Sequence, residues 1–129
     1  MFEPVYETNM NFIRELYNAW LSGRHSGWGI KLTRRGQYED AMKHYKLALM
    51  HESKSGTGPN PATLESLARA YARLGNLKEA LIVAEEACDL YKRLNSNDSL
   101  IVDSIIRVEK LIAGLKSSNM DDINKILTI

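Results

Sequence analysis

Residues 67–87 read LARAYARLGNLKEALIVAEEA, and this stretch decides the fold. Small side chains recur where a helical core would normally carry large ones, at Ala68, Ala80, Ala84 and Ala87. Gly75 lies between the two halves, where a left-handed C-cap ends one helix and the next helix can begin. Alanines allow two antiparallel helices to approach at the short end of the usual separation of about 8–10 Å. The stretch therefore predicts an αα-hairpin whose helices pack closely.

The flanking sequence repeats this hairpin. An offset of 39 residues aligns small residues in three pairs, which are Gly36 with Gly75, Ala41 with Ala80, and Ala48 with Ala87. A further offset of 38 residues aligns residues 65–69 with 103–107, after which the similarity fades. Repetition at a fixed period is typical of helical units that stack on one another, since one unit cannot bury its apolar face alone.

Capping residues place the other helix boundaries. An apolar stripe through Phe12, Leu16 and Trp20 predicts an N-terminal helix that ends at Ser22-Gly23. Asn60-Pro61 is a strong helix start, with asparagine as N-cap and proline as the first helical residue. Asn76 followed by Glu79 three residues later predicts a capping box.

We therefore expect a single domain over residues 1–129. Its predicted parts are an N-terminal capping helix over 9–22, a first repeat over 24–52, a second repeat over 61–94, and a degenerate third repeat with a C-terminal cap over 99–129.

This pattern resembles the tetratricopeptide repeat. In that family a large residue, a small residue and an aromatic residue precede a glycine turn, and alanines follow at fixed intervals on the second helix. The matching positions in the second copy are Leu67, Ala68, Tyr71, Gly75, Ala80, Ala84 and Ala87, and in the first copy Trp28, Gly29, Leu32, Gly36, Tyr38, Ala41, Tyr45 and Ala48. The resemblance is good over about residues 24–94 and weak as far as 114.

The units are 38–39 residues long, against about 34 in the usual repeat. The excess falls in the loop SKSGTGPNP at residues 53–61, so the units look like the kinesin-light-chain variety. The resemblance implies an all-α fold in which antiparallel helical hairpins stack as a short right-handed solenoid with capping helices at both ends.

Composition limits the classes of function. The net charge is +1, which provides no general attraction to nucleic acid. Cys88 is the single cysteine and excludes an internal disulfide framework. The N-terminus has no signal-peptide pattern, and no apolar run reaches the ~18–20 residues that span a bilayer. We therefore expect a cytoplasmic protein that is not inserted in a membrane.

Catalytic and metal-binding patterns are absent from the sequence. His44 and His51 are seven residues apart, whereas a helical metal pair needs a spacing of about three or four and a further ligand. We therefore interpret the histidines as exposed polar residues and predict no metal, no cofactor and no catalytic residue.

The resemblance also implies a binding site, because in that family the first helix of each pair lines a concave groove that holds a peptide. Carried over position by position, the groove residues are Ser26, Ile30, Arg34, Glu65, Arg69, Arg73, Asp103, Arg107 and Lys110. The basic residues suit an acidic or carboxylate-terminated peptide, but pairing of the same arginines with Glu65 and Asp103 inside the domain remains equally open. The family's clamp for chaperone tails has lysine and asparagine where this chain has Ser26, Ile30 and Ser66, which argues against that ligand.

The sequence thus predicts a non-catalytic adaptor that binds a protein or peptide partner. The main alternative is a self-association module that forms a homo-oligomer through Ile101, Ile105 and Ile112 or through the terminal helices. Against it, a tail helix could fold back over the same apolar face through Ile123, Ile126 and Leu127.

Two other hypotheses have less support. Residues 38–49 resemble an MIT-like trafficking domain, but that domain does not explain a second copy 39 residues later. A nucleic-acid surface lacks both a basic balance and a known motif. Its candidate residues are Lys31, Arg34, Arg35, Lys43 and Lys46.

Overall fold

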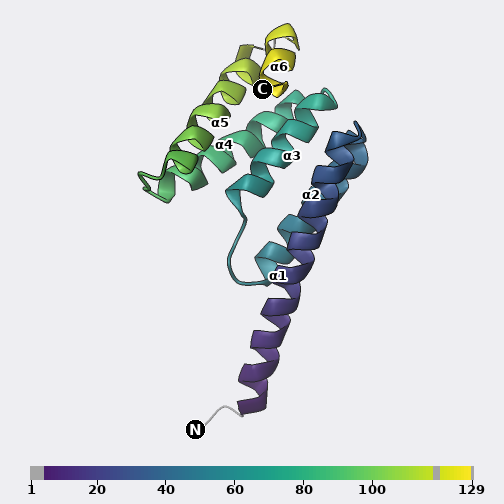
Figure 1. Cartoon of the computed structure of the whole chain (residues 1–129), viewed down its shortest axis with the longest axis vertical. Helices are drawn as coiled ribbons and strands as arrows, with labels where there is room; N and C mark the ends of the chain where they lie inside the picture. Colours follow the sequence, from purple (N-terminus) through teal and green to yellow (C-terminus); the bar gives the residue numbers. More distant parts are fainter. Residues whose placement is uncertain (1–4, 118–119, 129) are drawn as a thin grey trace.

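The computed structural model describes residues 5–117 and 120–128 of the chain (Figure 1). These residues form six α-helices and no strand, so the predicted all-α fold is confirmed. The helices are α1 (Val5–Arg34), α2 (Tyr38–Lys54), α3 (Pro61–Arg73), α4 (Leu77–Arg93), α5 (Ser99–Ser117) and α6 (Met120–Leu127). None of these described helices combines the length and apolarity that a membrane crossing requires.

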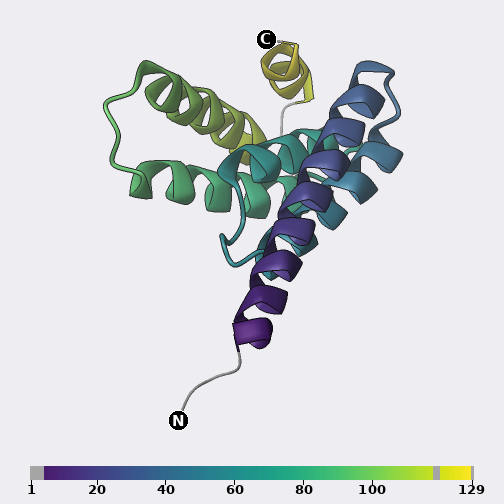
Figure 2. The same cartoon turned by 60° about the horizontal axis from the view of Figure 1, so that its bottom comes forward.

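The helices stack in pairs. The α1–α2 and α3–α4 pairs form antiparallel hairpins, α3 packs on α2, and α5 packs on α4 (Figures 1 and 2). The short helix α6 turns back against α5 and also contacts α3. This order is that of stacked hairpins, with the third pair reduced to one long helix and one short helix.

Alanines lie where the helices meet. The repeated alanines have no exposed surface, and they are Ala41, Ala48, Ala68, Ala80, Ala84 and Ala87. Tyr45, Tyr71 and Leu111 pack around them as the larger members of the core. Gly29 serves the same purpose on α1, because a Cβ atom there would lie 2.5 Å from the ring of Tyr45. Small side chains therefore set the helix separation in both hairpins.

The two hairpin turns have the same construction. Gly36 and Gly75 have φ angles of +75° and +80°, in the left-handed region that glycine adopts without strain. The amide after each glycine donates to a carbonyl five residues earlier, Gln37 N–H to Leu32 and Asn76 N–H to Tyr71. This is the bond pattern of a Schellman C-cap, as Gly75 indicated in the sequence.

The start of α3 also follows its sequence signal, whereas the start of α4 does not. Asn60 Oδ1 accepts a hydrogen bond from the Ala62 amide at 2.9 Å, and Pro61 is the first helical residue. The Asn76 side chain makes no capping bond, so the predicted capping box is wrong. The Schellman turn that holds the Asn76 amide already sets the start of α4.

The predicted boundary at Ser22-Gly23 is wrong, because α1 continues unbroken from Val5 to Arg34. Each internal glycine costs a helix about 1 kcal/mol, and packing of the C-terminal part of α1 against α2 offsets this cost. No separate helix 9–22 exists. Its apolar stripe does not cover a neighbouring repeat, since Phe12, Leu16 and Trp20 are 60%, 53% and 55% exposed.

The tail helix α6 folds back over the apolar face of α5. Ile123 and Leu127 are buried, and Ile126 lies so close to Gly114 that a Cβ atom there would be 2.6 Å from its Cδ1. The three isoleucines proposed for self-association, Ile101, Ile105 and Ile112, are half-buried and pack against the core.

We expect Ala80→Val to lower the free energy of unfolding by about 1–3 kcal/mol, because the added methyl groups overpack the close contact between helices. Ala113→Val is the matched control, since Ala113 is exposed and should lose only a helix-propensity difference of roughly 0.5–0.7 kcal/mol. Urea denaturation measures both. Equal losses in the two variants would mean that the buried alanines do not limit how closely the helices approach each other.

Candidate functional site

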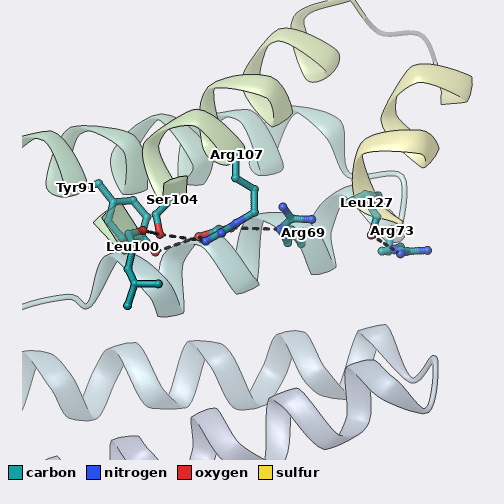
Figure 3. Close-up of polar contacts among 8 residues, drawn as sticks. Arg69, Arg73, Tyr91, Leu100, Ser104, Arg107 and Leu127 are labelled. Carbon is teal, nitrogen blue, oxygen red and sulfur yellow. Dashed lines mark hydrogen bonds and ion pairs between the residues drawn. The ribbon is translucent and has the colours of Figure 1, made fainter. Parts of the chain in front are cut away.

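A buried carboxylate organises the polar side chains between α3, α4 and α5. Glu65 on α3 is 6% exposed. Its Oε1 accepts from the Tyr91 hydroxyl at 3.0 Å and from Arg107 Nη2 at 2.8 Å, and its Oε2 accepts from Arg107 Nε at 2.5 Å (Figure 3). Arg107 Nη2 also donates to Ser104 Oγ at 3.2 Å. We call this set, with Arg69, the Glu65 network.

The members of the Glu65 network come from three helices, α3, α4 and α5. Arg69 lies four residues after Glu65, on the same helical face, and its Nε is 3.4 Å from Glu65 Oε2. Tyr91 comes from α4 and Arg107 from α5. The network therefore joins the second hairpin to the helix that stacks on it.

Protonation states in the network follow from burial and charge. Burial by itself would raise the pKa of Glu65, but the hydrogen bonds and positive charge of Arg107, with Tyr91 and Arg69, hold that pKa below its ordinary value. Burial and the neighbouring Glu65 charge raise the pKa of Tyr91 to about 12. At neutral pH the carboxylate is therefore ionised and the Tyr91 hydroxyl donates to it.

Arg73 binds the protein's own tail instead of remaining free. Its Nη2 donates to the carbonyl of Leu127 at 2.9 Å, and its guanidinium lies 5.3 Å from the centroid of the Tyr38 ring. Figure 3 shows this contact beside α6, apart from the Glu65 network. The helix α6 thus occupies the end of the α3 face next to Gly75.

The structure brings together some of the predicted groove residues and separates others. Glu65, Arg69 and Arg107 form one network. Asp103 and Lys110 are exposed on α5 and line, with Arg107, Ile106 and Ile126, a cavity of about 170 Å³. The three predicted residues of α1 take no part in the Glu65 network within the described chain: Ser26 is half-buried, and Ile30 and Arg34 are exposed.

A cavity of about 670 Å³ was not anticipated from the sequence. The loop before α3, the end of α4 and the start of α5 enclose it, and its apolar wall includes Leu94, Leu100 and Ile101. Ser104 lines the cavity and also contacts Arg107, so the cavity borders the Glu65 network. The sequence signal was the loop at residues 53–61, which was interpreted as the excess of the lengthened repeat and as a helix start, but not as the wall of a cavity.

Glu52 holds that loop in place. This buried carboxylate accepts from the Asn60 amide and from the Thr63 hydroxyl, both at 2.8 Å. Ser55 Oγ donates to the carbonyl of Glu52 at 2.7 Å. The lengthened loop is therefore anchored to α2 and forms a defined wall of the cavity.

The interpretation of the histidines as exposed polar residues is wrong, because all three are half-buried. His25 on α1 meets His44 and His51 on α2: His25 Nδ1 is 3.0 Å from His44 Nδ1, and the His25 and His51 rings stack at 5.5 Å. His51 Nδ1 is 2.8 Å from Asn18 Oδ1. The sequence reasoning missed this because His25 and His44 are on different helices.

The surroundings of His25 favour its neutral imidazole. Only one proton can lie between the two Nδ1 atoms of His25 and His44. Partial burial, together with the neighbouring His44, His51 and Arg24, lowers the pKa of His25 below its ordinary value. No group of three or more metal-ligating side chains with suitable geometry occurs among residues 5–117 and 120–128.

Comparison with known proteins yields one match. A family model described as tetratricopeptide repeat matches residues 21–93, which include the predicted first hairpin and nearly all of the second. The searches of curated proteins and of solved structures returned no match.

We expect Arg107→Met to lower the free energy of unfolding by about 1–3 kcal/mol, because Glu65 then keeps its buried charge with fewer donors. Lys110→Met on the same helix is the control and should stay within about 0.5 kcal/mol. Because the pKa of Glu65 is lowered in the folded state, the difference should be complete above the ordinary glutamate pKa and be lost as the pH falls through the lower pKa of the folded state. Urea denaturation at neutral and acidic pH measures this, and a pH-independent difference would contradict it.

The lowered pKa of His25 should make stability depend on pH. Because folding lowers the pKa of His25, the unfolded chain binds more protons, so stability should fall as pH decreases from about 7.5 to 5.5. His25→Asn should reduce this slope, since it removes one imidazole from the cluster. Thermal unfolding followed by circular dichroism measures the melting temperature of both proteins, and identical slopes would exclude His25 as the cause.

Proposed function

Because the chain belongs to the tetratricopeptide repeat family, whose members typically act as non-catalytic modules of protein–protein interaction, we propose that it binds an extended acidic segment of a protein partner. The segment lies on the face that α3 and α5 form and places one apolar side chain in the 670 Å³ cavity.

The balance of charge on the first helix of each pair supports an acidic segment. Among the nine predicted groove residues, the cations are Arg34, Arg69, Arg73, Arg107 and Lys110 and the acids are Glu65 and Asp103, which leaves a net charge of +3. Glu65 does pair with Arg69 and Arg107, which is the internal pairing considered as an alternative. Its single negative charge neutralises only one of the two positive charges of these arginines.

The observation that carries the proposal is that two guanidinium groups converge on a single carboxylate. Each arginine offers five N–H donors, and Glu65 has only two oxygens to accept them. Arg69 Nη2 is buried and has no hydrogen-bond partner in the described part of the chain. The side chain of Arg107 is 41% exposed. A second carboxylate, from a partner, would accept charge-assisted bonds from the exposed N–H groups of Arg107 and from the part of Arg69 that is 20% exposed.

The apolar cavity would bind the apolar side chain of the partner segment. Leu94 and Leu100 on its wall are 55% and 72% exposed, and ligand sites commonly combine an apolar hollow with a few placed polar groups. Because the cavity borders Ser104 and the Glu65 network, an apolar side chain in the cavity places its neighbours beside Arg107. Since Arg73 is bound to α6, we assign the acidic residues of the partner to Arg69, Arg107 and Lys110.

Selection from a random peptide-display library tests the proposal without a known partner. We expect the enriched peptides to contain an apolar residue flanked by aspartate or glutamate. Binding of the best peptide, followed by fluorescence anisotropy, should weaken about tenfold for each of Lys110→Glu and Leu100→Glu, the loss of roughly one charge-assisted or apolar contact.

Matched controls lie on α4. Lys78→Glu makes the same charge change and Ile82→Glu the same apolar-to-acid change at exposed positions outside the proposed face, and both should bind like the wild type. Enriched peptides without acidic residues, or equal weakening by the controls, would contradict the proposal.

A further inference from the structure

The N-terminal part of α1 extends beyond the end of α2 (Figures 1 and 2). It carries an apolar surface that the rest of the described chain leaves open. Its large apolar residues are each more than half exposed, and they are Met10, Phe12, Ile13, Leu16, Tyr17 and Trp20. A surface of this size is typical of an interaction site, because single exposed apolar residues are normal but contiguous ones are not.

Four of these residues have the spacing of a coiled-coil seam. Met10, Ile13, Tyr17 and Trp20 follow one another at intervals of three, four and three residues, which is the a and d pattern of heptads. The rings of Tyr17 and Trp20 stack at 6.2 Å, and the guanidinium of Arg24 lies 5.1 Å from the centroid of the Trp20 ring. The seam therefore ends at Arg24.

The seam is turned away from α2. The side of α1 that faces α2 and its following loop contains Asn18, which bonds to His51, and Glu15, whose carboxyl lies near Gly56. With about 100° of rotation per residue, the seam lies well over 100° around the helix from that side. The seam is thus accessible while both hairpins stay packed.

The area and charge of the seam fit a second copy of this chain. The four seam side chains, together with Phe12 and Leu16 beside them, present roughly 700 Å² in total, close to the ~800 Å² that each partner contributes to a stable interface. Arg14 and Glu15 are the only charged residues between positions 10 and 20, so the segment has no net charge that would repel its own copy.

We propose that two copies of the chain associate through an antiparallel pairing of their α1 seams. With the two-fold axis near Glu15, Trp20 packs against Met10 of the second copy and Tyr17 against Ile13. Each aromatic ring then meets an aliphatic side chain, whereas a parallel pairing would place Trp20 on Trp20 and Tyr17 on Tyr17. The dimer uses a different surface from the α3–α5 face, so each copy can hold its own partner segment.

Sedimentation equilibrium of the whole chain tests the dimer. At about 1–100 µM, a range in which interfaces of this size associate, we expect twice the monomer mass. Ile13→Glu should weaken association at least tenfold, and Ile82→Glu should not. The two isoleucines are 58% and 59% exposed, so the control matches in residue type and exposure. Unchanged melting temperatures would show that both variants fold.

A monomer mass at every concentration would overturn the proposal, as would a dimer that survives Ile13→Glu or dissociates equally with Ile82→Glu. Orientation is tested separately by oxidising dimers of proteins that carry one added cysteine and in which Cys88 is replaced by alanine. An equal mixture of Ile13→Cys and Tyr17→Cys proteins should form intermolecular disulfides more efficiently than either alone. Efficient cross-linking of Ile13→Cys with itself would overturn the antiparallel order.

Discussion

Close approach of neighbouring helices is the constraint on which the rest of the structure depends. Two hairpins can stack with a shared core only if the side chains between them are methyl-sized, and Ala41, Ala68, Ala80 and Ala84 supply that line with no exposed surface. At native packing density no void remains to absorb a larger side chain there. This helix separation positions the tyrosine rings and leucines that fill the core. It also sets the distance between α3 and α5, which the single ion pair of Glu65 and Arg107 can bridge.

The Glu65 network shows how such a stack positions charged groups. A carboxylate that is almost fully buried needs donors, and it obtains them from three successive helices, through Arg69, Tyr91 and Arg107. A buried ion pair adds little net stability compared with apolar packing. The network instead fixes the relative position of α3, α4 and α5, and it leaves positive charge on the surface beside an apolar cavity. The binding face that we propose is therefore a by-product of how the second and third units are joined.

The two ends of the stack of helices differ in how far other parts of the chain cover them. At the C-terminal end, α6 covers α5 with Ile123 and Leu127 and binds Arg73, so a short piece of the chain closes the core and also shortens the face that a partner can use. At the N-terminal end, α1 is longer than the α2 helix that packs against it, and no other described part of the chain covers its apolar surface. Helical arrays need both ends covered for solubility, and this asymmetry is what makes a second copy a suitable cover for α1.

The sequence by itself determined the helical class, both glycine turns, the close-packed alanine line and the family, because each of these depends on local residue types at a regular spacing. It also identified Glu65, Arg69 and Arg107 as neighbours on equivalent helices, but it left open whether they pair with one another. Only the tertiary structure decided that they do, that α1 continues through Gly23, that three histidines meet between α1 and α2, and that a cavity lies between the loop before α3 and the start of α5. These features depend on which side chains from distant segments come within a few ångströms, and helix periodicity specifies a face without specifying its neighbour.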